Sequence, residues 1–445
     1  MQIRSILAGL CTLSACAVAR APDSETNDAL VLAQQAAPPS SPGLTTEPAD
    51  DAALGVFDAR EIKTYALTLA PEDLAKLDAQ PAAEKYVRAT LAVDGESLPV
   101  AVRYKGSVGA FMAPCTAGGF SRGPKTGKCS FKIAFDEYDP DARFHGLKKL
   151  NLHSMNNDPS LLLERLSYGL FREMGVAASR AMHVRVTVNG KLEGLFLAVE
   201  EIDGRFTRAR FPEDGKGNVY KEVWPMHADA RRYQTALETN KAAGKVDKMV
   251  AFKRAIDADP ASAVATYLDR DYMLRYLAVD RVIMNDDGPF HLYCFGPVFY
   301  NHNFYWYEQE KADRMWLLPW DIDHALGTGP ETLITPAWWQ PTTDCSCRAG
   351  RGGLPNLPGA CEPLIKVFGT WKADYDAAVD TLLRGPFSQA EVDAKLSAWS
   401  AQIAPHVRDA SALPGGATEA AWRSGIDRLR AEIDSLRRNR GYKYP

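Results

Sequence analysis

The sequence Trp316-Leu317-Leu318-Pro319-Trp320-Asp321-Ile322-Asp323 places two aspartates directly after a run of mostly apolar residues. A second acidic stretch, Asn285-Asp286-Asp287, follows the apolar pair Ile283-Met284 earlier in the chain. Carboxylates are costly to bury unless they are paired or coordinate a metal. The two stretches therefore predict a compensating cation, and Mg²⁺ with a phosphorylated ligand is the first candidate. The alternative is that Asp321 and Asp323 cap a helix or a turn.

The start of the chain predicts export. Met1-Gln2-Ile3-Arg4 is a short basic segment, residues 6–13 are mostly apolar, and Leu13-Ser14-Ala15-Cys16 resembles the lipobox of bacterial lipoproteins. We therefore expect residues 1–16 to be a lipoprotein signal peptide, with a lipidated Cys16 as the expected membrane contact. The expected location is the bacterial cell envelope: the outer membrane, the periplasm or the cell surface. A plain cleaved signal or a short buried helix is the alternative.

Residues 17–53 are rich in Ala, Pro, Ser, Thr and acidic residues, with Pro38-Pro39-Ser40-Ser41-Pro42 near the middle. This composition buries too little apolar surface to fold, so we expect a disordered tether. From Leu54 onward the chain is long enough for two lobes. The formal net charge of −4 argues against nucleic acid as a partner.

The cysteines agree with export. Of eight cysteines, Cys11 lies in the expected leader and Cys16 is expected to carry lipid. The remaining six are Cys115, Cys129, Cys294, Cys345, Cys347 and Cys361. An even number in an exported chain favours disulfides. Cys115 and Cys129 bracket a glycine-containing loop and could close it with a disulfide. Cys361 could pair with either Cys345 or Cys347, and the one that remains would pair with Cys294. A zinc site is less favoured, because Cys345-Ser346-Cys347 has one residue between its cysteines.

Apolar periodicity predicts an α+β fold. Expected strands cover residues 62–69, 86–93, 98–104, 130–135, 147–152, 183–188 and 195–199, with hairpin turns at Asp94-Gly95 and Asn189-Gly190. A helix is expected between Asp158-Pro159-Ser160 and Gly175, and the second half reads as mostly helical. This order fits a strand-rich nucleotide-binding lobe over residues 54–203 and a larger helical lobe over residues 204–445. It also fits many other α+β folds.

A series of motifs then narrows the choice. In chain order they are Lys149-Leu150-Asn151-Leu152, Asn156-Asn157-Asp158-Pro159-Ser160 with Glu164, Val188-Asn189-Gly190 with Gly194-Leu195-Phe196 and Glu200, Gly217-Asn218-Val219-Tyr220-Lys221, Asn285-Asp286-Asp287, His302-Asn303-Phe304-Tyr305-Trp306-Tyr307, and Pro319-Trp320-Asp321-Ile322-Asp323 with Gly327. Together they resemble the spore-coat protein H (CotH) kinase family from about Tyr104 to Gly327, and more loosely through the helical tail.

The resemblance implies an atypical protein-kinase-like fold, two-lobed, that binds ATP with Mg²⁺ or Mn²⁺ and transfers the γ-phosphate to Ser or Thr of a protein. Family members in spore formers modify Ser-rich coat proteins, so a nucleotide and a Ser-rich surface protein are the implied partners. Phosphoryl transfer needs a cation on the phosphates, oxygen ligands on the metal, and an acid that orients the attacking hydroxyl.

On the nucleotide side, Lys132 resembles the lysine that holds the α- and β-phosphates, and Glu164 resembles its ion-pair partner. Lys128 and Lys149 are the substitutes for Lys132. Further expected nucleotide contacts are Lys105, Gly106 and Ser107, in a glycine-containing stretch after a strand, together with Glu200 and Ile202. Alone, the glycine-containing stretch is equally a tight turn.

On the acceptor side, Asp287 is the predicted catalytic carboxylate. Asp321 is the predicted main Mg²⁺ ligand, Asn303 the second, and Asp323 assists the metal or braces the loop. Asp280 competes with Asp287, because Asp280 and Asn285 have the Asp-x4-Asn spacing of conventional kinase catalytic loops.

Two segments depart from the family pattern. Residues 288–297 are aromatic and contain a cysteine, where the family usually has a tryptophan soon after the aspartate. Residues 338–358 also carry cysteines and are expected to form a stapled loop beside Asp321. Their aromatic side chains suit an acceptor or glycan platform, or simple loop packing. Two other functions stay open: a catalytically inactive surface-binding or adhesion protein on the same fold, and a nucleotidyl or other transferase, since ATP is scarce outside the cytoplasm.

Overall fold

The computed structural model describes residues 41–48, 51–58, 60–106, 109–112, 114–117, 123–295, 298–327, 339–349, 355–414 and 416–440. The expected signal peptide, residues 1–16, lies outside these ranges. Within them, no helix has both the length and the apolar character that a membrane span requires.

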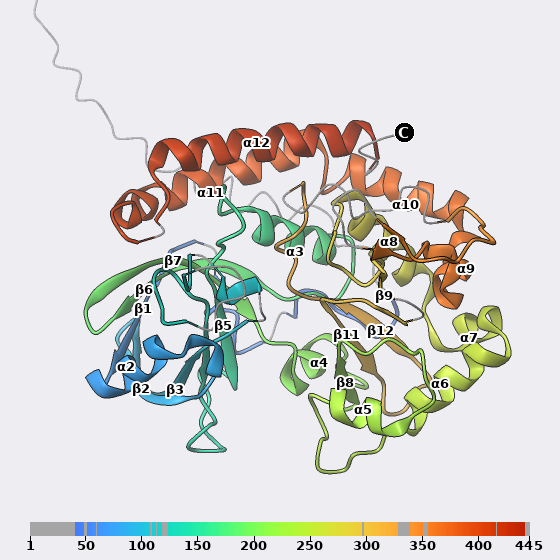
Figure 1. Ribbon diagram of the computed structural model, residues 1–445, viewed down its shortest axis with the longest axis horizontal. Helices are drawn as coiled ribbons and strands as arrows, with labels where there is room; N and C mark the ends of the chain where they lie inside the picture. The colour runs from blue at the N-terminus through green and yellow to red at the C-terminus, as the bar shows by residue number, and fades with distance from the viewer. Residues whose placement is uncertain are drawn as a thin grey trace, which may run out of the picture.

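Seven strands of the first half close into a barrel in the order β1-β2-β3-β4-β5-β7-β6 (Figure 1). They are β1 (Thr64–Leu69), β2 (Val87–Val93), β3 (Glu96–Tyr104), β4 (Phe131–Ala134), β5 (Lys149–His153), β6 (Ala181–Val188) and β7 (Lys191–Glu200). Neighbouring strands run antiparallel, except β1 and β6, which are parallel. Both predicted hairpin turns are confirmed: Asp94-Gly95 and Asn189-Gly190 have positive φ at both residues, as tight hairpins require.

The second half surrounds a three-stranded sheet, ordered β12-β11-β8, and a small four-stranded sheet, ordered β10-β9-β14-β13. These strands are β8 (Asn218–Lys221), β9 (Tyr293–Phe295), β10 (Val298–Tyr300), β11 (Phe304–Glu308), β12 (Met315–Pro319), β13 (Arg348–Ala349) and β14 (Pro355–Asn356). The helices of the chain are α2 (Pro71–Ala79), α3 (Leu163–Glu173), α4 (Gly204–Arg210), α5 (Ala230–Ala236), α6 (Asp247–Ala258), α7 (Pro260–Tyr267), α8 (Arg270–Val282), α9 (Pro363–Gly369), α10 (Lys372–Arg384), α11 (Gln389–Ala410) and α12 (Glu419–Arg438), with 3₁₀ turns at Pro81–Ala83, Gly109–Phe111 and Gly359–Cys361.

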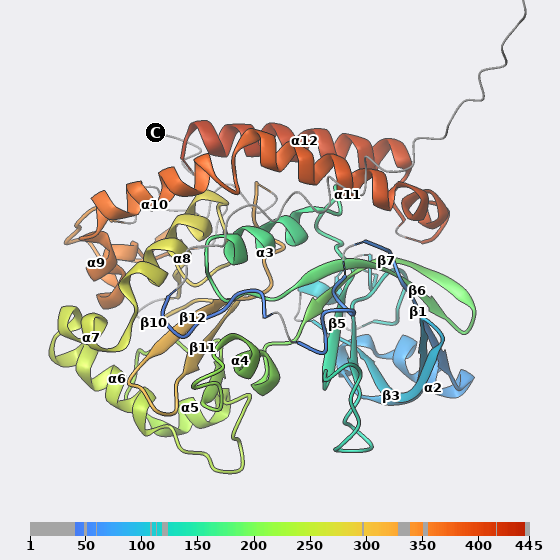
Figure 2. The same ribbon diagram turned by 180° about the vertical axis from the view of Figure 1, so that it is seen from behind.

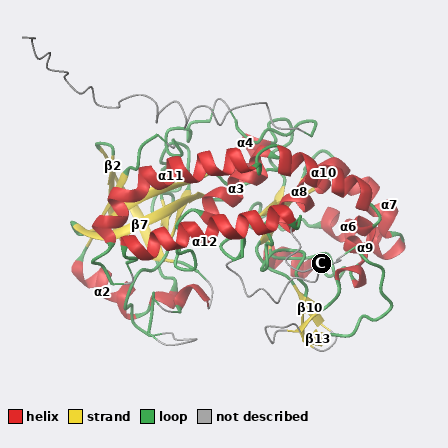
Figure 3. Cartoon of the chain, turned by 90° about the horizontal axis from the view of Figure 1, so that it is seen from above, coloured by secondary structure: helices red, strands yellow, loops and turns green. Residues whose placement is uncertain are grey.

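Helices α11 and α12 lie side by side and, seen from above, run across the molecule from the barrel towards the other helices (Figure 3). Helix α11 contacts β7 of the barrel. Seen from behind, α9 and α10 lie at the end of the molecule away from the barrel (Figure 2). The chain is therefore α+β, as the sequence predicts, with strands concentrated in the first half.

The apolar residues form two cores that do not divide at the predicted boundary, residue 203. One core fills the barrel. The other, larger core includes α3, whose Leu166 and Leu170 are fully buried. The Phe171 ring lies 5.1 Å from the ring of Tyr276 in α8. Helix α3 belongs to the first half in sequence, but it packs against α8 of the second half as well as against β6 of the barrel.

The expected tether reached Ala53, and this boundary is wrong for the residues that the structure describes. Leu44 is 7% exposed and joins the larger core. The Thr45 N–H donates to the Arg210 carbonyl at 2.8 Å, and Asp51 forms ion pairs with Arg180 and Arg205. A polar segment can pack through backbone hydrogen bonds and ion pairs, which composition alone does not reveal.

Candidate functional site

One end of the β11–β12 hairpin carries two of the predicted metal ligands. Strands β11 and β12 pair from Phe304 with Pro319, so Asn303 precedes one strand and Asp321 follows the other. The Trp320 N–H donates to the Asn303 carbonyl at 3.2 Å. Asn303 and Asp321 have φ of 61° and 50°, a left-handed conformation that Asn and Asp adopt more readily than most residues.

Three elements meet at Asp321. Its N–H donates to the hydroxyl of Tyr168 in α3 at 3.0 Å. His153 at the end of β5, Glu164 of α3 and Asp321 each offer a ligand atom, and these atoms lie within 4.8 Å of one another. The barrel, α3 and the hairpin thus converge on one point. We call Glu164, Asp287, Asp321 and Asp323 the acid centre.

Two aspartates of the acid centre, Asp321 and Asp323, have pKa values shifted in opposite directions. Burial opposes ionisation of Asp321, but Lys105, His153 and Lys221 outweigh it and lower its pKa. Burial, together with repulsion from Asp321 and Glu164, raises the pKa of Asp323 well above its usual range. An excess of carboxylates of this kind suits a divalent cation, and oxygen ligands are those that Mg²⁺ and Mn²⁺ prefer.

Asp323 reaches a second element as well. Its Oδ2 accepts a hydrogen bond from Asn157 Nδ2 at 2.9 Å, and Asn157 belongs to the segment before α3. This contact agrees with the predicted bracing role. It leaves the metal-assisting role as a prediction.

Asp287 is held at both carboxylate oxygens. Tyr293 donates its hydroxyl to Oδ1 at 2.6 Å, and Asn303 Nδ2 donates to Oδ2 at 2.9 Å. The side chain is half-buried, between the buried Asp286 and Gly288. Because the Asn303 amide nitrogen faces Asp287, the amide oxygen is the atom with which Asn303 would bind a metal.

The rival Asp280 has a different environment. It is fully buried, forms an ion pair with Arg281 at 2.6 Å and accepts a hydrogen bond from Asn285 Nδ2 at 2.9 Å. The Asp-x4-Asn spacing therefore describes a local hydrogen bond at the end of α8. An acceptor hydroxyl could not reach this carboxylate, which favours Asp287.

The predicted ion pair between Lys132 and Glu164 is wrong. Lys132 Nζ instead lies 2.6 Å from Oε1 of Glu201, and Glu201 also accepts from Asn151 Nδ2 at 2.6 Å. Lys132 and Asn151 are direct partners in the β4–β5 register, and Glu201 follows β7, the next strand. Glu164 accepts from His153 Nδ1 at 2.8 Å. The pairing follows the barrel register, which motif spacing does not reveal.

Glu201 gives a pH-dependent contribution to stability. Burial disfavours its charged form, but Lys132 and Asn151 outweigh burial and lower its pKa from 4.5 to about 2. A carboxyl with a lowered folded pKa binds fewer protons than in the unfolded chain, so its contribution is complete above pH 4.5 and is lost as the pH falls towards 2. Through this group alone, we expect the free energy of unfolding to fall by on the order of 3 kcal/mol as the pH decreases from 4.5 to 2. Urea unfolding at several pH values should show a shallower acid dependence in Glu201→Gln, and an unchanged dependence would contradict the assignment.

Lys105 contacts two residues beside the acid centre, His153 and Trp320. Its Nζ donates to His153 Nε2 at 3.0 Å and lies 5.5 Å from the ring centroid of Trp320. On the other side of the ring, His153 Nδ1 lies 2.8 Å from Oε1 of Glu164. Lys105, His153 and Glu164 form a continuous chain of contacts. His153 was missed by sequence reasoning, although its alternation with Asn151 along β5 marks a polar face.

The other predicted nucleotide contacts differ in outcome. Gly106 has φ of 144°, and a Cβ there would lie 2.2 Å from the Ala110 Cβ, so the turn requires glycine. Its N–H donates to Glu84 Oε1 at 3.0 Å. Ser107 lies outside the described residues. The substitute Lys128 donates to the carbonyls of Ser154 and Leu195.

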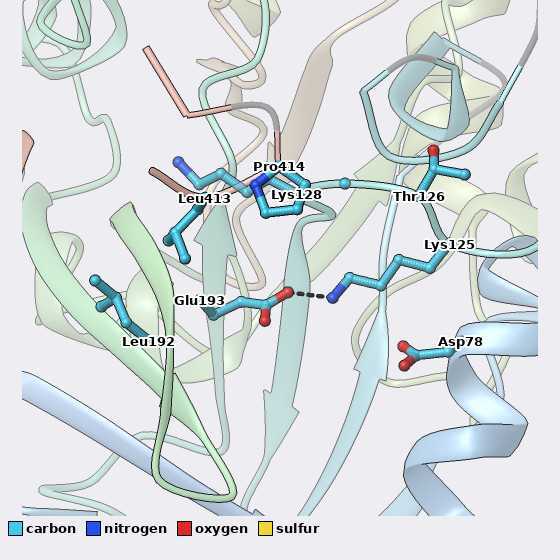
Figure 4. A pocket seen from close by; sticks show the side chains of 9 residues that line it. Asp78, Lys125, Thr126, Lys128, Leu192, Glu193, Leu413 and Pro414 are labelled. Carbon is cyan, nitrogen blue, oxygen red and sulfur yellow. Dashed lines mark hydrogen bonds and ion pairs between the residues drawn. The ribbon is translucent and has the colours of Figure 1, made fainter. Parts of the chain in front are cut away.

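Lys128 lines a separate pocket, shown in Figure 4, of about 220 Å³. The pocket lies between the barrel and the turn at Leu413-Pro414, and the Lys125–Glu193 ion pair crosses it. Neither Asp287 nor Asp321 lines this pocket. Lys128 therefore does not serve the acid centre.

Glu200 and Ile202 are not accessible to a nucleotide, which contradicts their predicted role. Ile202 is 1% exposed and lies in the larger core. The Glu200 side chain is fully buried and forms ion pairs with Arg180, Arg205 and Arg210. Burial opposes its ionisation, but the three guanidinium groups outweigh it and lower the Glu200 pKa. The Glu200 carboxylate therefore stabilises the fold through its ion pairs and is not available to a nucleotide.

Glu200→Ala is expected to lower the free energy of unfolding by about 3–5 kcal/mol, because it leaves buried guanidinium groups without their carboxylate. Urea unfolding followed by circular dichroism measures the loss. Glu96→Ala is the matched control, since its ion pair with His145 is exposed and contributes about 1 kcal/mol or less. Similar losses in the two variants would contradict the inferred role.

The predicted disulfides are confirmed and the open pairing is settled. The bonds are Cys115–Cys129, Cys294–Cys347 and Cys345–Cys361. Cys294–Cys347 joins the segment around Cys347 to β9, which begins six residues after Asp287 in the chain, and Cys345–Cys361 links two parts of that segment to each other. The disulfides therefore confirm that the described part of this loop is stapled, and its expected position beside Asp321 stays a prediction.

The comparisons with known proteins agree with the sequence motifs. A family model described as "CotH kinase protein" matches residues 102–439. The inner spore coat protein H of Bacillus subtilis strain 168 is 27% identical over 278 residues, which cover 59% of this chain and 68% of that protein. The inner spore coat protein H-like protein of the same strain is 33% identical over 73 residues, 16% of this chain and 22% of that protein. The family match contains the whole acid centre.

Proposed function

This chain belongs to the CotH kinase family, and on that premise we propose that it transfers the γ-phosphate of ATP to Ser or Thr of a protein acceptor with Mg²⁺ or Mn²⁺. The observation that carries the proposal is the convergence of Glu164, Asp321 and a lysine-bound histidine, His153, at one point. Asp287 is linked to the same β11–β12 hairpin by the hydrogen bond that it accepts from Asn303. Metal, phosphate and acceptor functions thus each have a candidate group.

The donor set fits a divalent cation. Asp321 and Glu164 would bind it, with the amide oxygen of Asn303 as a further ligand, and both His153 nitrogens are engaged by Glu164 and Lys105. When bound, such a cation neutralises phosphate charge in the transition state. The surplus carboxylates around Asp323 support its presence.

The protein groups have separate roles in the proposed reaction. Lys105 would bind the phosphates, since it is the cation that contacts His153 beside Asp321. Asp287 would orient the acceptor hydroxyl and receive its proton as the new O–P bond forms and ADP leaves. The hydrogen bonds from Tyr293 and Asn303 fix the plane of the carboxylate for this task.

The location follows in part from the disulfides. Three disulfides in one chain indicate an exported protein. We further propose that the signal peptide over residues 1–16 is removed and that lipidated Cys16 anchors the mature chain to the cell envelope. A Ser-rich surface protein is the proposed acceptor.

Labelled ATP tests the proposed reaction. The disulfide-bonded protein is incubated with γ-labelled or α-labelled ATP, with Mg²⁺, Mn²⁺ or EDTA, and with a Ser-rich protein. We expect metal-dependent transfer of the γ-label to Ser or Thr. Transfer of the α-label instead would indicate nucleotidyl transfer, and metal-independent or absent nucleotide binding would indicate a surface-binding protein. Either result would overturn the proposal.

A further inference from the structure

The carboxylate of Asp287 is oriented by a tyrosine that sequence motifs do not single out. Tyr293 is 7% exposed, and its hydroxyl donates to Asp287 Oδ1 at 2.6 Å. Because Asn303 holds the other oxygen, the carboxylate plane is fixed from two directions. Loss of either bond would free the group to rotate, and misplacement of a reacting group by about 1 Å costs on the order of 100-fold in rate.

Tyr293 is itself held by the small four-stranded sheet. It pairs with Tyr300 of β10 and with Asn356 of β14. Its ring stacks on that of Tyr300, with centroids 5.4 Å apart and planes at 18°. The next residue, Cys294, forms a disulfide with Cys347. The backbone at Tyr293 is therefore restrained by strand pairing with β10 and β14 and by the disulfide at the next residue.

The second disulfide ties the small sheet to a helix. Cys345 is bonded to Cys361, and Glu362, the next residue, caps α9 by accepting from the Ile365 N–H at 2.8 Å. The two bonds share a short segment, since one residue separates Cys345 from Cys347. Strand β9 is thus linked through two disulfides to the start of α9, which packs in the larger core.

We propose that Tyr293 is a positioning residue for Asp287, and that the Cys294–Cys347 disulfide maintains it. The inference rests on the proposed phosphoryl transfer and assigns a role to the segment that departs from the family pattern. In this role Tyr293 contacts neither nucleotide nor metal. It acts on the rate of transfer through the orientation of the carboxylate.

Tyr293→Phe removes the hydroxyl and keeps the ring. We expect kcat for phosphoryl transfer to fall about 10- to 100-fold, as for other residues that support a catalytic group, while KM for ATP changes by less than about twofold. Tyr104→Phe is the matched control, because the Tyr104 hydroxyl also donates to an aspartate, Asp78 Oδ1, at 2.6 Å. The control should keep the wild-type kcat, and thermal unfolding of both variants measures any loss of stability.

Removal of the disulfide gives an independent test. Cys294→Ser with Cys347→Ser should lower kcat in the wild-type background but add little in the Tyr293→Phe background, because both changes act on one hydrogen bond. Cys115→Ser with Cys129→Ser is the control, since that bond closes a loop beside the barrel. It should lower the unfolding temperature without the same dependence on Tyr293.

The outcomes separate the two proposals. An active wild type whose Tyr293→Phe variant keeps full kcat overturns the role of Tyr293 and leaves the proposed reaction intact. Equal losses in Tyr293→Phe and Tyr104→Phe also overturn that role, because they would reflect stability alone. A wild type that transfers no phosphate overturns the proposed reaction, and the role of Tyr293 with it.

Discussion

Asp287→Ala is expected to reduce kcat for phosphoryl transfer by about 10²- to 10⁴-fold, the usual contribution of a positioned acid or base. The carboxylate is half-buried and is held at both oxygens by Tyr293 and Asn303, and alanine removes the group that these two bonds orient. Nucleotide binding should persist, because Asp321, Glu164 and Lys105 remain. Steady-state transfer of the γ-label gives kcat, and calorimetric titration with a non-hydrolysable ATP analogue gives the affinity.

The control for Asp287→Ala is Asp374→Ala, which removes an exposed carboxylate paired with Arg270 on the surface. This variant should transfer phosphate at the wild-type rate. Full activity of Asp287→Ala would exclude Asp287 as the catalytic group. Asp280 would not be its replacement, because that carboxylate is fully buried against Arg281.

Asp321→Asn is expected to weaken metal-dependent nucleotide binding by about 100-fold or more, since even partners outside the ligand sphere contribute 10- to 100-fold to metal affinity. The fold should be nearly unaffected: the shape is conserved, and the backbone bond to the Tyr168 hydroxyl remains. Titration of the variant with Mn²⁺, with and without an ATP analogue, measures the loss. Thermal unfolding without metal verifies the fold.

Asp136→Asn is the matched control, because that aspartate pairs with Lys148 at 3.4 Å, away from the acid centre. Its metal and nucleotide affinities should equal those of the wild type. If Asp321→Asn bound Mg²⁺ and nucleotide normally, Asp321 would not be the main metal ligand. The two variants at Asp287 and Asp321 therefore separate transfer from binding.

The sequence predicted which acidic residues belong to the site better than it predicted their hydrogen-bond and ion-pair partners. Asp287, Asp321 and Asp323 were singled out because acids after apolar strands and helices are unusual, and the structure brings them close enough for their charges to interact. The hairpin turns and the Cys115–Cys129 bond were also predictable from turn chemistry and cysteine spacing. The choice between Cys345 and Cys347 as the partner of Cys361 was not, and the structure decides it.

The pairing of charges was not predictable in the same way. Lys132 binds Glu201 and Glu164 binds His153 because the barrel register and the position of α3 decide which side chains meet. Glu200 was read as part of the nucleotide site because it stands in a motif, whereas three arginines brought together by folding enclose it. Such contacts depend on residues far apart in sequence, and periodicity carries no information about them.

Every member of the acid centre lies before residue 327, yet α12, far along the chain, supports it. Trp422 Nε1 donates to the Ser160 carbonyl at 2.8 Å, and a Cβ on Gly425 would lie 2.6 Å from the Pro159 carbonyl. These contacts hold the start of α3, the helix that bears Glu164. A shortened fragment that kept all four acids but ended soon after Asp323 would lose both contacts and leave the segment before α3 without this support. The smallest unit worth expressing, or grafting onto another protein, therefore extends through Arg438.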